Sequence, residues 1–342
     1  MPLAPLTTLK VGGPARYFVR STTEEQVLVS FEFAKSKGLD IFVLGGGSNL
    51  VVSDAGFDGL VVQIALKGIS NGNEGSLDSA SSVFVKAQAG EDWDRFVEFC
   101  VSQGLAGLEC LSGIPGFVGG TPVQNVGAYG QEVSESITSV RCIDRVSGEI
   151  VELLNKDCGF SYRTSIFNST ARDRFVVLAV NYSLVKGGKP KIAYKDIREF
   201  FRGRQPTLSE TREAVLQVRR LKSMVIDPSD PNSLSAGSFF KNPIVPNEKY
   251  EEIASGYDGP VPKFGVDKST VKIPAAWLIE HSGFHKGFRL GNAGISTNHT
   301  LAIINCGGAT AAEIIKLKIA IQTGVEKSFG ILLQREPVFV GF

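Results

Sequence analysis

Apolar residues recur at helical spacing in several segments bounded by residues typical of helix ends. Thr22 and Glu25 have the spacing of a capping box, apolar positions follow on one face, and Gly38 is expected to end that helix. The same reasoning predicts helices over 91–103, 208–222, 274–282 and 310–328. Pro274 is expected to be the first helical residue of its segment.

Short β-branched or apolar runs between these segments predict strands at 41–44, 60–64, 83–87, 137–143, 149–153, 175–184, 301–305 and 339–340. Because strands and helices do not alternate strictly, the pattern favours an α+β fold over a doubly wound sheet. Two polar stretches, 70–82 and 186–206, are candidate domain boundaries.

The charge balance argues against several classes of partner. Lys and Arg number 36 and Asp and Glu number 35, which gives a net charge of +1, so bulk electrostatics predicts binding to neither nucleic acid nor a membrane surface. No apolar run is long enough for a membrane span, and the first residues lack the pattern of a signal peptide. We therefore expect a cytoplasmic protein.

The five cysteines, at 100, 110, 142, 158 and 306, show no C-x-x-C spacing, and the three histidines all lie after residue 280. These patterns predict no disulfide framework, no zinc site and no His-rich metal centre.

Glycine is the residue that composition singles out, with 38 of 342 residues, about 11% against a usual ~7%. Three glycines follow an apolar strand in the loop 44–50, and eight glycines fall within 104–130. Taken alone, the first loop is either a tight turn or a phosphate-binding nest. The second is a long irregular loop, or a strip of main chain laid along an extended ligand such as a diphosphate.

Seven motifs in a fixed order then carry a resemblance. They are residues 9–15, 44–50, 113–116 with 124–130, 160–163, 237–243, 276–280 and 335–336. Together they resemble the UDP-N-acetylenolpyruvoylglucosamine reductase family of bacterial peptidoglycan synthesis, in the subclass that has a substrate-closing tyrosine loop.

The resemblance implies an α+β fold in three parts. A two-part FAD-binding region of the vanillyl-alcohol-oxidase type would comprise residues 1–70, with 331–342 returning to it, and residues 71–205. A substrate-binding domain would follow over 206–330. The implied protein is a monomer that binds FAD non-covalently and takes electrons from NADPH.

The implied reaction converts UDP-N-acetylglucosamine enolpyruvate to UDP-N-acetylmuramate, by hydride transfer from flavin N5 to the alkene and protonation of the neighbouring carbon. Arg163 and Glu336 would stabilise the enolate that develops, and Ser238 would donate the proton. Taken alone, these residues indicate only an ion-pairing arginine, a turn serine and a strand-end carboxylate. Pro337 departs from the β-branched residue that is commoner in the family.

Further residues are carried over from the resemblance by position. The implied cofactor-binding residues are Gly45, Gly46, Gly47, Ser48, Asn49, Leu50, Ser112, Gly113, Ile114, Pro115, Gly116, Gly120, Thr121, Asn125, Gly127, Ala128 and Arg219. The implied substrate-binding residues are Tyr162, Tyr194, Lys222, Asn242 and His299. A two-residue insertion after Lys222 weakens that part of the alignment.

Two alternatives stay open at the level of sequence. One is an FAD-dependent alcohol or aldonolactone oxidase, although the absence of an N-terminal histidine argues against its covalent-flavin variant. The other is a non-catalytic sensor of nucleotide sugars.

Overall fold

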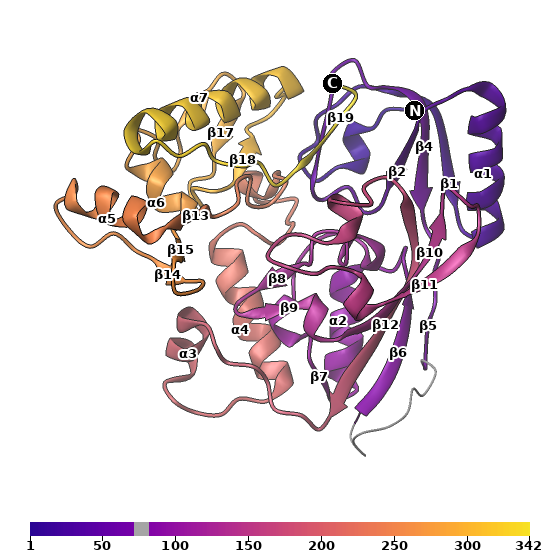
Figure 1. The fold of residues 1–342 in the computed structure, drawn as a ribbon, viewed down its shortest axis with the longest axis horizontal. Helices are drawn as coiled ribbons and strands as arrows, with labels where there is room; N and C mark the ends of the chain where they lie inside the picture. The colour runs from indigo at the N-terminus through magenta and orange to yellow at the C-terminus, as the bar shows by residue number, and fades with distance from the viewer. Residues whose placement is uncertain (72–81) are drawn as a thin grey trace. The chain divides into compact units, whose positions relative to one another are not determined.

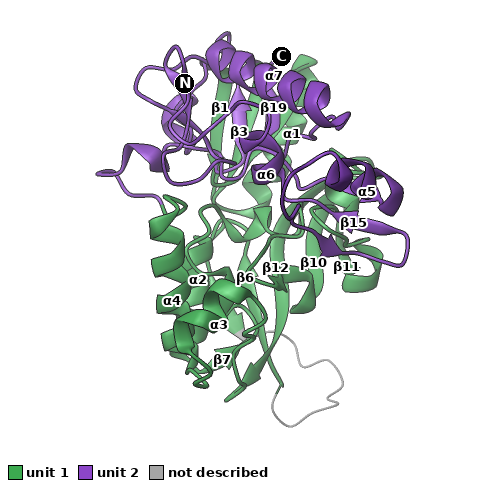
Figure 2. Ribbon diagram, turned by 90° about the vertical axis from the view of Figure 1, so that its left-hand side faces the viewer, with its two compact units in different colours: residues 1, 15–47, 58–225 green, residues 2–14, 48–57, 226–342 purple. Residues whose placement is uncertain are grey.

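The computed structural model describes residues 1–71 and 82–342, so most of the polar stretch at 70–82 lies outside the described residues. The chain forms two compact units, each assembled from separate segments (Figure 2). The first unit contains residues 1, 15–47 and 58–225, and the second contains residues 2–14, 48–57 and 226–342.

The first unit is built on two sheets (Figure 1). The smaller has the order β1-β4-β2, with β1 at Ala15–Ser21, β2 at Ile41–Leu44 and β4 at Phe57–Ile64. β2 and β4 run parallel, with Ile41 opposite Leu60. The larger sheet has the order β11-β10-β12-β6-β5, and β7 pairs with β12. Its strands are β5 Ile69–Asn71, β6 Ser82–Gln88, β7 Leu105–Ala106, β10 Ile137–Asp144, β11 Ile150–Leu154 and β12 Phe175–Lys186.

The helices of the first unit bury apolar faces against this framework. They are α1 at Glu24–Lys37, α2 at Trp93–Ser102, α3 at Lys195–Phe201 and α4 at Leu208–Leu221. Trp93 and Phe96 of α2 are fully buried with Tyr182 of β12, and the ring centroids of Phe96 and Tyr182 lie 5.0 Å apart. The glycine-rich segment between α2 and β10 adds the short strands β8 Gly127–Ala128 and β9 Gln131–Glu132, and the 3-10 turns η2 Glu109–Leu111 and η3 Val118–Gly120.

The second unit packs three small sheets with three helices (Figure 1). β3 at Leu50–Val52 pairs in parallel with β19 at Val338–Val340. The other strands are β13 Ile244–Pro246, β14 Phe264–Gly265, β15 Thr270–Lys272, β16 Arg289–Leu290, β17 Ala293–Ile295 and β18 Ile303–Asn305. The helices are α5 Asn247–Ser255, α6 Ala275–Glu280 and α7 Ala311–Phe329.

Most predicted elements are confirmed, with shifts of a few residues at their ends. β2 has the predicted bounds, and α1 and α7 end at Gly38 and Gly330, both in the left-handed conformation. Two predicted helix starts were wrong by one residue. Thr23 caps α1 and accepts a hydrogen bond from the Gln26 N–H, and Pro274 precedes α6 instead of opening it.

Several elements were not predicted, among them α3, α5 and β1. The mixture of helices and sheets confirms the α+β class. Within the described ranges, no helix is both long and apolar enough to cross a membrane.

Candidate active site

The two glycine-rich loops meet within the first unit. A Cβ atom on Gly46 would lie 2.7 Å from the Gly116 Cα and 2.9 Å from the Phe117 nitrogen. Real Cβ atoms do not approach other atoms so closely, so only glycine fits at residue 46. The contact joins two loops that lie 70 positions apart in the sequence.

Helix α2 fixes the second loop. The Trp93 N–H donates to the Gly116 carbonyl at 3.0 Å, and the Gly113 N–H donates to the Asp94 carboxylate at 2.5 Å. Gly113 has a φ of +72°, a conformation that side chains disfavour. The first turn of α2 therefore positions the main chain of the loop at two points.

Arg219 lies beside this loop. Its side chain is buried, with 7% exposed, and its Nη2 donates to the Met224 carbonyl at 2.6 Å. Its Nε, which would lie 3.3 Å from a Cβ on Gly113, has no hydrogen-bond partner among the described residues. Burial lowers the pKa of this guanidinium, and Tyr129 and Asp94 act against that shift. A buried cation with an unused donor beside glycine main chain fits an anionic group such as the diphosphate of FAD.

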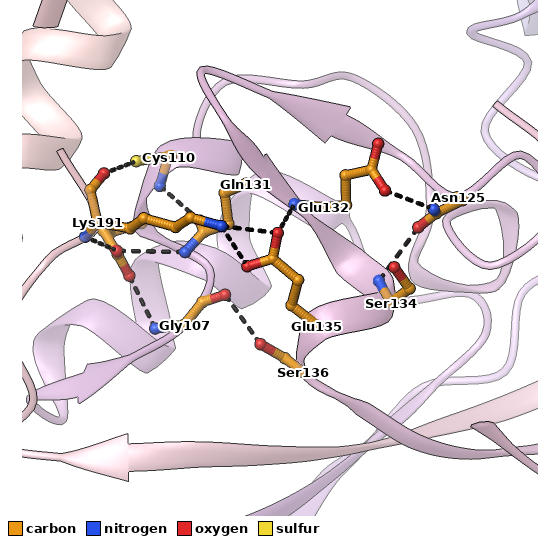
Figure 3. Close-up of polar contacts among 10 residues, drawn as sticks. Gly107, Cys110, Asn125, Gln131, Glu132, Ser134, Glu135, Ser136 and Lys191 are labelled. Carbon is orange, nitrogen blue, oxygen red and sulfur yellow. Dashed lines mark hydrogen bonds and ion pairs between the residues drawn. The ribbon is translucent and has the colours of Figure 1, made fainter. Parts of the chain in front are cut away.

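Three predicted cofactor residues use their side chains to hold the loop itself. The Ser112 hydroxyl donates to the Glu109 carbonyl at 2.7 Å, and the Thr121 hydroxyl donates to the Val118 carbonyl at 2.8 Å. The Asn125 amide donates to Glu132, and its oxygen accepts from the Ser134 N–H (Figure 3). The same amide also donates to the Ser161 carbonyl.

Arg163 is held by the same segment. Its Nη2 donates to the Gly127 carbonyl at 2.5 Å, and its guanidinium lies over the Tyr162 ring, 5.3 Å from the centroid. The Arg163 backbone has a φ of +53°, and its carbonyl accepts from the Asn168 amide at 3.2 Å. The structure therefore brings Arg163 together with two predicted cofactor residues, Asn125 and Gly127.

A buried carboxylate anchors the chain that leads to Tyr194 (Figure 3). Glu109 is 1% exposed and accepts from the Gly107 N–H, the Gln131 amide and the Lys191 N–H. The Lys191 ammonium pairs with Glu135 at 2.7 Å. Lys191, three residues before Tyr194, is thus held through its backbone by Glu109 and through its side chain by Glu135.

Tyr194 and Lys222 lie close together in the first unit. The Tyr194 ring meets the Tyr129 ring edge to face at 5.5 Å, and the Lys222 ammonium pairs with Asp196 at 3.0 Å. Burial alone would lower the pKa of Lys222, but Asp196 and the two tyrosines outweigh it and leave the pKa raised. Lys222 therefore carries a positive charge at neutral pH.

The second unit brings Ser238 and Glu336 onto paired segments. Phe240 and Arg335 form an antiparallel bridge, and the Glu336 N–H donates to the Phe239 carbonyl at 2.9 Å. The Lys241 N–H donates to the Gln334 carbonyl at 2.9 Å. Ser238 and Glu336 are both partly exposed, so two of the three predicted catalytic residues are neighbours in this unit.

The other predicted residues of the second unit hold its loops. The Asn242 side-chain oxygen accepts from the Ala275 N–H at 2.8 Å, at the start of α6. The Asn49 amide donates to the Glu336 carbonyl at 3.4 Å. Ser48 and His299 accept hydrogen bonds through their backbone carbonyls, from the Thr8 hydroxyl and the Ala302 N–H.

Three residues of these clusters were not predicted as site residues: Glu109, Tyr129 and Asp196. Tyr129 stands inside a glycine-rich motif, Gly127–Gly130 in the sequence, and that position was a usable signal. No local pattern assigned a role to Glu109 or Asp196, because the contacts that join them to Lys191 and Lys222 span 82 and 26 positions.

Comparisons with known proteins agree with this geometry. A family model described as an FAD binding domain matches residues 15–154, and the model for the C-terminal domain of UDP-N-acetylenolpyruvoylglucosamine reductase matches residues 228–340. A UDP-N-acetylenolpyruvoylglucosamine reductase from Thermobifida fusca is 43% identical, over 100% of this chain and 97% of its own length. The enzyme of the same name from Streptomyces coelicolor is 44% identical, over 99% and 89%.

The fold leads to the same family. The crystal structure of UDP-N-acetylenolpyruvylglucosamine reductase from Thermus caldophilus superimposes with a TM-score of 0.68 at 25% identity, covering 99% of this chain and 97% of the other. The chain therefore belongs to the UDP-N-acetylenolpyruvoylglucosamine reductase family of FAD-binding oxidoreductases.

Proposed function

We propose that this chain reduces UDP-N-acetylglucosamine enolpyruvate to UDP-N-acetylmuramate in peptidoglycan precursor synthesis, with NADPH as the electron donor. The observation that supports this most directly is the contact of the glycine loops at Gly46 and Gly116, together with the buried Arg219 beside Gly113 of the second loop. FAD bound there supplies hydride transfer. We propose that the protein works in the cytoplasm as a monomer.

The main chain of 45–47 and 112–128, together with Arg219, is proposed to hold the cofactor. Backbone N–H groups of glycine loops bind phosphate oxygens because no Cβ keeps the ligand away. Arg219 adds a fixed positive charge whose Nε is free to donate. Ser48, Asn49 and Leu50 of the second unit continue the first loop in sequence.

Arg163 is proposed to stabilise negative charge on the enolpyruvyl group. Adding hydride to the alkene leaves an enolate-like carboxylate, and a guanidinium binds such a group with two parallel hydrogen bonds. The contact with Gly127 and the Tyr162 ring hold the guanidinium in place before the substrate arrives. Such preorganisation lowers the cost of stabilising the developing charge.

Ser238 is proposed to deliver the proton to the carbon next to the carboxylate, and Glu336, on the paired segment, to help Arg163 stabilise the enolate. A serine hydroxyl is a weak acid, so it needs neighbours that stabilise the alkoxide or replace its proton. The backbone pairing of 239–241 with 334–336 keeps Glu336 near Ser238, and this pairing supports the assignment.

Tyr194, Lys222, Asn242 and His299 are proposed to contact the nucleotide sugar. Lys222 would bind a phosphate oxygen as a point charge, and Tyr194, 37% exposed, would close over the diphosphate.

Anaerobic spectroscopy tests the proposal. The purified protein should show the absorbance of an oxidised flavin, lose it on adding NADPH, and recover it on adding the enolpyruvyl substrate alone. Flavin that stays reduced after this addition would contradict the proposed reaction.

A further inference from the structure

Five polar groups gather at one place in the first unit: Tyr129, Tyr194, Asp196, Arg219 and Lys222. Burial raises the pKa of Tyr129; Arg219 and Lys222 oppose the shift, and Asp196 and Tyr194 add to it, so all four lie within electrostatic range of its ring. The cluster therefore holds two cations, with Asp196 as the acidic group beside them. Within this cluster, Lys222 Nζ forms an ion pair with Asp196 Oδ2 at 3.0 Å.

This ion pair is accessible to a ligand. The Lys222 and Asp196 side chains are 36% and 40% exposed. Pairs this exposed stabilise the fold little, because solvent screens them and two long side chains lose rotamer freedom. A stronger anion can therefore replace Asp196 on Lys222 without a large loss of stability.

The backbone on both sides of Asp196 is fixed. On one side, Lys191 is held through its N–H by Glu109 (Figure 3). On the other, Ile197 and Phe201 of α3 are buried against Ala214 and Val215 of α4. These anchors flank Asp196 and keep its carboxylate beside Lys222 at a high local concentration while no ligand is bound.

We propose that Asp196 is an internal competitor for the nucleotide diphosphate. The Asp196 carboxylate neutralises Lys222 while no ligand is bound, and an incoming diphosphate must displace this carboxylate from Lys222 in order to bind. Asp196 thereby lowers the affinity of the site for its ligand and eases product release. This inference rests on the proposed function, in which Lys222 binds a phosphate of the nucleotide sugar.

Asp196→Asn tests the inference, because it removes the charge and keeps the size and shape of the side chain. Titration calorimetry of the FAD-loaded protein with uridine 5′-diphosphate should give a Kd about three- to tenfold lower than that of the wild type. The gain should shrink as salt is added. Uridine, which has no phosphate, should bind both proteins equally.

A matched control lies on the same helix. Glu199 pairs with Lys195 at 3.6 Å, and both side chains are exposed. Glu199→Gln removes the same charge from α3 without touching Lys222, so it should leave the Kd within about twofold of the wild type. Asp196→Ser serves as the second variant if Asp196→Asn fails to fold.

A double variant tests the route through Lys222. Lys222→Met should weaken diphosphate binding, and adding Asp196→Asn to it should recover much less than the single variant gains. An equal gain with and without Lys222 would overturn the inference. So would unchanged or weaker binding in Asp196→Asn.

Turnover of the enolpyruvyl substrate separates this inference from the proposed function. A wild type that reduces the substrate, with no change of diphosphate affinity in Asp196→Asn, keeps the function and overturns the inference. A wild type that binds the diphosphate without reducing the substrate contradicts the function, and the titration still decides the role of Asp196. Failure of every variant and of the wild type to bind the diphosphate overturns both.

Discussion

Arg163 occupies a backbone conformation that few residues adopt. Its φ of +53° costs an arginine on the order of 1 kcal/mol relative to glycine. Its own contacts with Gly127 and with the Asn168 amide offset this cost. Strain that is retained and compensated in this way is typical of residues whose side chain must point in one direction.

Ser238 carries the sharpest prediction at the residue scale. Ser238→Ala removes the proposed proton donor and leaves the glycine loops of the first unit untouched. NADPH should still reduce the flavin at the wild-type rate, and reduction of the enolpyruvyl substrate should slow by roughly 10²–10⁴-fold. Stopped-flow absorbance of the two half-reactions measures both rates.

The control for this variant is Ser255→Ala. The Ser255 hydroxyl is exposed and, among the residues that the structure describes, bonds only to the Glu252 carbonyl of its own helix, so both half-reactions should keep their rates. Normal turnover of Ser238→Ala would remove this serine from the mechanism.

At the scale of elements, Asp94 joins α2 to α4. Its carboxylate accepts two hydrogen bonds from Arg212, at 2.6 and 2.9 Å, and one from the Gly113 N–H. Burial alone would raise the pKa of Asp94, but the Arg212 and Gly113 hydrogen bonds outweigh it and leave the pKa below its ordinary value of 3.8. A lowered pKa means that the ionised form stabilises the fold.

This linkage gives a pH-dependent prediction. The stabilisation is complete above the ordinary pKa of Asp94 and is lost as the pH falls through the lowered one. Asp94→Asn should lower the free energy of unfolding at pH 7 by about 1–2 kcal/mol, and the difference from the wild type should narrow as the pH falls below the ordinary pKa of 3.8. Urea unfolding at several pH values measures the difference in unfolding free energy between the variant and the wild type. A difference that stays constant with pH would contradict the stabilising role of the ionised Asp94.

Asp54 stabilises α7 from a distant point in the chain. Its two carboxylate oxygens accept from the Ala311 and Ala312 N–H groups at 2.7 and 3.0 Å. Because these N–H groups have no partner within the helix, Asp54→Ala should cost about 1 kcal/mol of stability. Urea unfolding measures this loss, and Asp58→Ala is the control, since the exposed Asp58 side chain pairs with Arg16 on the surface. Equal stability of the two variants would argue against the cap.

The elements that sequence could predict are those with local signals. Gly38 and Gly330 end their helices in the left-handed conformation, as glycine allows. Helix α3 has only seven residues and no side-chain cap, and it depends on Ile197 and Phe201 packing against α4. Such tertiary support leaves no local pattern, so this helix was missed.

The distinction between local signals and tertiary contacts also applies to the candidate site. The glycine density of both loops is visible in the sequence, but the contact of Gly46 with Gly116 depends on how α2 holds the second loop. The roles of Arg163, Ser238 and Glu336 came from the order of motifs and stay predictions. The pairing of 239–241 with 334–336 is long-range, and no spacing in the sequence indicates it.

At the scale of the whole molecule, the five cysteines differ in reactivity. All are free, four are buried, and Cys306 is partly exposed. Burial raises the pKa of Cys100 and Cys110 to about 12 and of Cys158 to about 11, and it also raises those of Cys142 and Cys306.

Ellman's reagent at pH 8 should therefore modify Cys306 alone in the native protein, and slowly, because the reactive thiolate is scarce. All five thiols should react after unfolding in guanidinium. Fast labelling of a second thiol in the native protein would contradict the burial of the other four. Cys306→Ser, which should show no native labelling, identifies the reactive site.

The pairing of β3 with β19 has a consequence for synthesis on the ribosome. The core of the second unit contains Leu9, Val11 and Val51 together with residues from 239 to 333, and β3 finds its partner only at 338–340. These early segments carry apolar side chains whose packing partners are translated much later. The second unit can therefore complete its folding only after residues 338–340 have been made, and a fragment that starts at residue 226 would lack part of its own core.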